Sequence, residues 1–133
     1  MGFRFIDHTA DVAFEVWGET ISELIESASH AFYEAFVEVD KLGTDTSRSV
    51  EVEAEDVDML LYKWLNELLY LFDTEFFAAK EVKVTADENR ARGVLIGSRF
   101  TPEMVKVEPK AITMHKFRVE KRDKYYAYVV VDI

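Results

Sequence analysis

The sequence predicts an α+β fold, a two-layer sandwich in which two main helices pack on a mostly antiparallel sheet. Three observations favour this class. Residues 21–39 carry apolar side chains at the three- and four-residue spacing of an amphipathic helix. Residues 59–72 are apolar on nearly every side, and most of the remaining chain alternates with period two. A chain of 133 residues can build one core, so we expect a single domain over residues 1–133.

The first helix has a defined start. Thr20 and Glu23 have the Ser/Thr-x-x-Glu spacing of a capping box, in which each side chain bonds a backbone N–H of the other residue. Residues 40–43 should close the helix. His30 lies away from the centre of the apolar stripe and is therefore predicted to be a surface residue. The stripe consists of Ile21, Leu24, Ile25, Ala28, Phe32, Ala35, Phe36 and Val39.

The second helix should lie in the core. Glu55, Asp56 and Asp58 precede it, where negative charge suits the positive end of the helix dipole. Because residues 59–72 are apolar almost all round, we expect protein to cover this helix on more than one side.

Strands account for the remaining pattern. We expect one hairpin with its turn at residues 87–89, and a charged turn at residues 121–124 before the last strand. The predicted strands span residues 3–7, 12–17, 48–54, 80–85, 91–100, 110–120 and 125–133.

The charge balance narrows the function classes. The chain has 26 acidic and 16 basic residues and a net charge of −10. A nucleic-acid binder acting alone needs a basic face that displaces counterions from phosphates. The balance therefore favours a basic protein partner or a cation. The simpler interpretation is that the excess of acid only keeps the protein soluble.

Several common chemistries are excluded by composition. The chain has no cysteine, which rules out disulfides, zinc–thiolate sites and thiol nucleophiles. It has no glycine-rich phosphate loop, no Gly-x-Ser-x-Gly elbow and no His-Glu-x-x-His motif. No apolar run is long enough to span a membrane and no leader is visible, so we expect a cytoplasmic protein with no membrane partner.

The polar stretch from His8 to Asp11 interrupts two apolar-alternating runs. One interpretation is a simple turn whose His8 and Asp11 are solvated. The other is a binding site. If the last strand delivers Asp132 and the carboxylate of Ile133 next to Asp11, three acids converge, and such a cluster must bind a cation or raise its own pKa values.

Two more polar residues lie near strand ends. Lys110 heads a predicted strand, and a lysine there is usually a solvated edge charge. Alternatively it complements Asp11 and Asp132, or contacts a phosphate or an acidic partner group. If its strand is regular, His115 faces the same side as Thr113 and Phe117. Two interpretations of His115 stay open, a histidine at the sheet surface and a functional residue.

Four motifs in order resemble the archease family over essentially the whole chain. They are His8–Asp11, Leu60–Tyr62 together with Leu65–Leu69 in the second helix, Lys110–His115 and the terminal Asp132–Ile133. Met114 departs from the pattern, since many relatives carry an aromatic residue there.

The resemblance implies an activator of an RtcB-type tRNA-splicing RNA ligase that promotes guanylylation and multiple turnover. The ligase is the implied partner, and the protein would contact tRNA only indirectly, through the ligase. The implied metal ligands are Asp11, Asp132 and Ile133, the last through main-chain or terminal oxygen, and Lys110 is the matching lysine. Hard oxygen donors suggest Ca²⁺, with Mg²⁺ or Mn²⁺ as alternatives. Two other functions stay open: a metal-dependent hydrolase using His8 or His115 as base, and a chaperone-like binding module.

Overall fold

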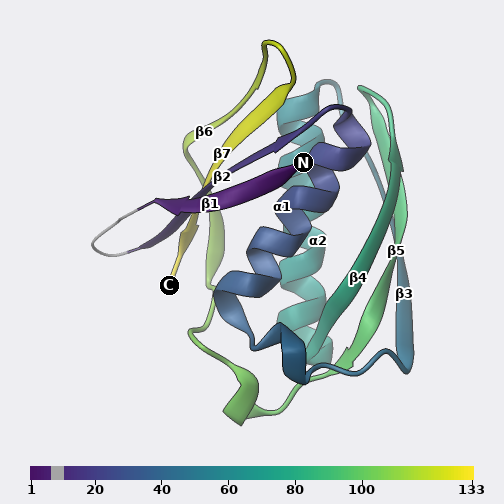
Figure 1. The fold of residues 1–133 in the computed structure, drawn as a ribbon, viewed down its shortest axis with the longest axis vertical. Helices are drawn as coiled ribbons and strands as arrows, with labels where there is room; N and C mark the ends of the chain where they lie inside the picture. Colours follow the sequence, from purple (N-terminus) through teal and green to yellow (C-terminus); the bar gives the residue numbers. More distant parts are fainter. Residues whose placement is uncertain (7–10) are drawn as a thin grey trace.

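The chain folds into two antiparallel sheets with a layer of two helices between them (Figure 1). The structure is a computed structural model that describes residues 1–6 and 11–133. The first sheet has the strand order β1-β2-β7-β6, and the second has the order β3-β5-β4. The elements are β1 Gly2–Ile6, β2 Asp11–Gly18, α1 Ile21–Phe36, β3 Thr46–Glu53, α2 Val57–Glu75, β4 Phe77–Ala86, β5 Arg90–Arg99, β6 Ala111–Lys121 and β7 Tyr125–Asp132, with short 3-10 turns at Val39–Lys41 and Pro102–Met104.

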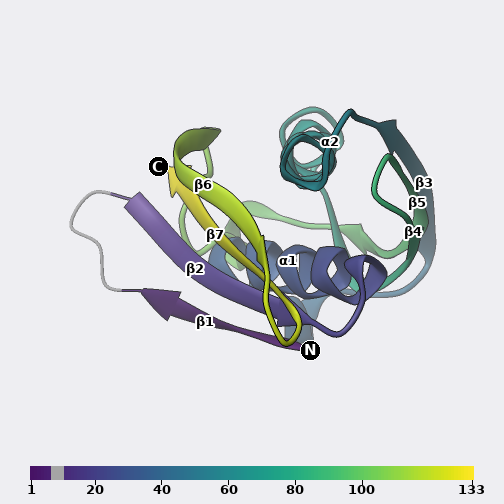
Figure 2. The same cartoon turned by 90° about the horizontal axis from the view of Figure 1, so that it is seen from above.

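The predicted fold class is confirmed, because both helices pack on antiparallel strands. Figure 2 shows how the strands are divided, with the four-stranded sheet on one side of the helices and the three-stranded sheet on the other. The division into two sheets depends on long-range pairing, which local periodicity does not reveal.

The start of α1 follows the prediction, whereas its end does not. The N–H of Glu23 donates to Oγ1 of Thr20 over 3.1 Å, so Thr20 caps the helix. The helix then ends at Phe36 and does not continue to Val39. Val37 leaves the helix and forms a β-bridge with Val105, a long-range pairing that overrides the apolar periodicity. His30 is half-buried, so this predicted surface residue is also partly covered by protein.

The prediction that α2 is covered on more than one side is confirmed, since it packs against strands of both sheets. Asp56 caps it by accepting a hydrogen bond from the N–H of Met59 over 2.8 Å. In the core between the helices, the indole N–H of Trp64 donates to the Ser29 hydroxyl over 2.9 Å. The same hydroxyl donates to the carbonyl of Ile25.

Side chains of α1 cover the outer edge of β4. Glu26 accepts a hydrogen bond from the N–H of Val84 over 2.8 Å, and Ser22 accepts one from the N–H of Ala86 over 2.9 Å. These bonds satisfy backbone donors that an edge strand otherwise leaves open.

Strand β6 is irregular in its middle. Thr113 pairs with Val130 and Arg118 pairs with Tyr128, so four residues of β6 bulge opposite one residue of β7. Lys116 within this bulge has a φ of 57°. Because the strand is not regular here, the condition under which Thr113, His115 and Phe117 would share one face is not met.

No helix in the described part of the chain is long and apolar enough to cross a membrane.

Candidate functional site

Two acids meet at one end of the four-stranded sheet. Asp11 is the first residue of β2 and Asp132 the last of β7, and the antiparallel register pairs them directly. Residues paired in this way project from the same face, with Cβ atoms roughly 5 Å apart. Like charges at such positions repel each other. The pair therefore favours a cation or several hydrogen-bond donors between the strand ends.

The neighbouring strand adds the predicted lysine. Ala111 begins β6 and pairs with Asp132 on the side opposite Asp11. The backbone N–H of Lys110, one residue earlier, donates to the carbonyl oxygen of Asp132 over 2.8 Å. The Lys110 side chain is exposed, and Ile133 beyond the end of β7 is 38% exposed. Asp11, Asp132, Lys110 and Ile133 thus lie together at one end of the sheet.

The two remaining predicted site residues are His8 and His115, and the structure does not place either of them beside Asp11 and Asp132. His8 lies outside the described residues, so its role stays a prediction. His115 lies in the bulge of β6, where its backbone N–H donates to Oγ1 of Thr113 over 3.0 Å. The register pairs it with neither Asp11 nor Asp132.

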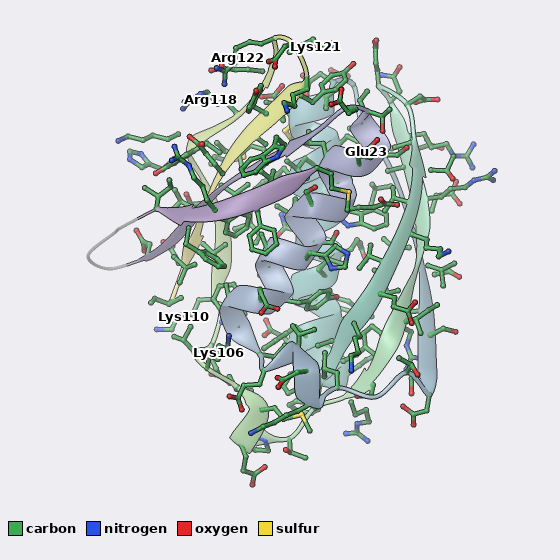
Figure 3. All side chains as sticks on the ribbon, in the orientation of Figure 1. Glu23, Lys106, Lys110, Arg118, Lys121 and Arg122 are labelled. Atoms are coloured by element: carbon green, nitrogen blue, oxygen red, sulfur yellow. The ribbon has the colours of Figure 1, made fainter. Side chains whose placement is uncertain are left out.

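Lys106 is a nearby residue that the sequence did not single out. Its Nζ donates to the carbonyl of Glu34 over 3.0 Å, and its backbone N–H donates to the carbonyl of Phe36 over 2.8 Å, so Lys106 satisfies two carbonyl oxygens in the last turn of α1. Figure 3 shows Lys106 and Lys110 on the left of the view, in the lower half of the molecule. The only signal in the sequence was its spacing of four residues before Lys110.

A hollow of about 350 Å³ opens beside Asp11. Its apolar walls come from β1, β2 and α1, and charged side chains of both signs reach it. The lining residues are Phe5, Ile6, Asp11, Val12, Ala13, Glu34, Ala35 and Lys106.

The donor set fits a hard cation only with help from other oxygens. Across residues 1–6 and 11–133, no three His, Cys, Asp or Glu side chains gather closely enough to hold a metal. Ca²⁺ takes six to eight oxygen ligands, roughly half of which two bidentate carboxylates can supply. Main-chain oxygen at Ile133 and water would have to complete the shell around Asp11 and Asp132.

These features describe a class of small α+β domains. Two helices lie between two antiparallel sheets, and a pair of acids lies at the end of one sheet. The Archease protein family (MTH1598/TM1083) model matches residues 3–133. The chain therefore belongs to the archease family, which confirms the resemblance.

Individual relatives agree with this assignment. The chain is 63% identical to Protein archease of Archaeoglobus fulgidus, with all of both chains covered. It is 36% identical to Protein archease of Pyrococcus furiosus over 96% of this chain and 95% of that one. The solution structure of Methanobacterium thermoautotrophicum protein 1598 superposes with a TM-score of 0.84, 31% identity and 99% coverage of both chains. A Thermotoga maritima crystal structure, titled an archease and possible chaperone, shares the fold at a TM-score of 0.67 and 22% identity, over 96% of this chain and 94% of that one.

Proposed function

We propose that this chain is a non-catalytic activator of an RtcB-type tRNA-splicing RNA ligase, which promotes guanylylation of the ligase and its multiple turnover. Membership of the archease family supports this function. The observation that carries the proposed site is the direct pairing of Asp11 with Asp132, because it places two carboxylates where a cation would relieve their repulsion.

The proposed ion is Ca²⁺, held by Asp11, Asp132 and main-chain oxygen at Ile133. Calcium accepts irregular shells of oxygen ligands, whereas Mg²⁺ demands near-octahedral geometry and keeps several waters. Lys110 would act beside the ion without binding it. Its ammonium would meet a phosphate or an acidic group of the ligase, since the lysine backbone is tied to Asp132 and its side chain is exposed.

The experiment is ligation of a split tRNA by limiting ligase with GTP and a divalent ion, with and without this protein. Wild type should convert a single turnover into repeated turnovers. Asp11→Asn removes one ligand charge at nearly constant volume and should abolish the stimulation. Asp45→Asn makes the same change at an exposed position in the turn before β3 and should leave the stimulation intact.

Two results would contradict the proposal. No stimulation by wild type would exclude the activator function. Full stimulation by a folded Asp11→Asn variant would exclude the metal-centred mechanism. Calorimetric titration with Ca²⁺ and Mn²⁺ gives a second measurement, in which Asp11→Asn should lose the binding that Asp45→Asn keeps.

A further inference from the structure

Three aromatic side chains lie on the face of the four-stranded sheet that is turned away from the helices. Phe14 and Val129 belong to the core, so the residues that alternate with them in β2 and β7 face outward. These include Trp17, Tyr126 and Tyr128, all of them partly exposed. Trp17 and Tyr126 are direct cross-strand partners. The two central strands thus present a platform of three rings, called here the aromatic platform.

Arginines from the edge strand and its turn are held over this platform. The guanidinium carbon of Arg118 lies 5.6 Å from the ring centroid of Tyr128, and that of Arg122 lies 4.0 Å from the ring centroid of Tyr126. Glu120 between them forms ion pairs with both arginines, at 2.7 Å and 3.4 Å. Figure 3 shows Arg118 and Arg122 close together at the β6–β7 hairpin. Stacking and ion pairing preorganise these two side chains at an exposed position.

The β6–β7 hairpin carries a local excess of positive charge, although the protein as a whole is acidic. Residues 116–124 hold five basic and two acidic side chains, a net charge of +3, whereas the whole chain carries −10. Solubility alone does not require the two signs to be segregated in this way. A localised positive charge beside aromatic rings points to a ligand that is anionic and offers flat surfaces.

We propose that the aromatic platform, with Arg118 and Arg122, binds single-stranded RNA directly. The arginines contact phosphates, and the bases stack on Trp17 and on the guanidinium planes that lie over Tyr126 and Tyr128. Four-stranded sheets bind RNA in this way, with aromatic side chains that stack two or three bases. Carboxylates of an acidic protein would match the charge, but they provide no aromatic ring faces to stack on the platform.

The platform also lies on the same face as the candidate site. Tyr128 and Asp132 are separated by four residues of β7, or roughly 13 Å of strand. Ala13 and Val130, which pair with each other between these two positions, are each only 1% exposed, so neighbouring side chains cover this part of the face. The proposed RNA contact is therefore limited to the aromatic platform and its two arginines. This contact goes beyond the proposed function, in which tRNA is met only through the ligase.

The test is a fluorescence anisotropy titration of a short labelled oligouridine with the isolated protein at low salt. Arg118→Glu/Arg122→Glu should weaken binding about tenfold or more, because it replaces two phosphate contacts by repulsion. Lys83→Glu/Arg92→Glu makes the same charge change at exposed positions of the other sheet and should leave binding unchanged. Circular dichroism establishes that each variant is folded.

A neutral variant separates stacking from charge. Tyr128→Leu keeps every charge and removes one ring, so binding should weaken on the order of tenfold. Equal loss in both charge variants would overturn the proposal, as would the absence of wild-type binding. Displacement of the RNA by polyglutamate at equal charge concentration would assign the surface to an acidic protein instead. Since no ligase is present, these failures are distinct from failure of the ligation experiment.

Discussion

His30 shows how local burial sets the charge of a single residue. It lies half-buried on α1, and burial lowers the pKa of its imidazole below the ordinary 6.5, while Glu26 and Glu34 oppose this to a smaller extent. The unfolded chain therefore binds the proton at a higher pH than the folded one. The contribution of neutral His30 to the free energy of unfolding is therefore fully present above about pH 6.5. It is lost as the pH falls from that value towards the pKa of the folded state. Urea unfolding at about pH 8 and about pH 5.5 measures this loss of stability on acidification. We expect the difference between the two pH values to be smaller in His30→Gln than in wild type. An equally steep loss in both proteins would contradict the prediction.

At the scale of elements, one buried hydrogen bond joins the two helices. Ser29 and Trp64 are both fully buried, and the Ser29 hydroxyl is the acceptor for the Trp64 indole N–H. Ser29→Ala leaves that N–H without a partner in the core, which should lower the free energy of unfolding by about 1–3 kcal/mol. Chemical denaturation measures this loss. Ser49→Ala, at an exposed position of β3, is the control and should change stability little. A Ser29→Ala protein as stable as the control would show that the bond contributes nothing.

Some features of the helices and strands could be predicted from the sequence, and others could not. Helix starts at Thr20 and Asp56 are signalled by residues within one turn, so they could be predicted. The end of α1 at Phe36 and the bulge in β6 depend on partners distant in the chain, namely Val105 and β7. The meeting of Asp11 with Asp132 was conditional, because alternation places a side chain on a face but does not choose the neighbouring strand.

At the scale of the whole molecule, we expect the overall negative charge and the basic β6–β7 hairpin to attract different partners. A net charge of −10 should speed encounter with a basic RNA-binding enzyme, so the association rate with the ligase should fall on the order of tenfold or more from low to physiological salt. Stopped-flow fluorescence measures that rate, and the dissociation rate should change less. Arg118→Glu/Arg122→Glu makes the protein still more acidic, so without RNA it should associate with the ligase at least as fast as wild type. Association that is insensitive to salt, or slowed by the added acids, would place the hairpin in the ligase interface and contradict this division of charge.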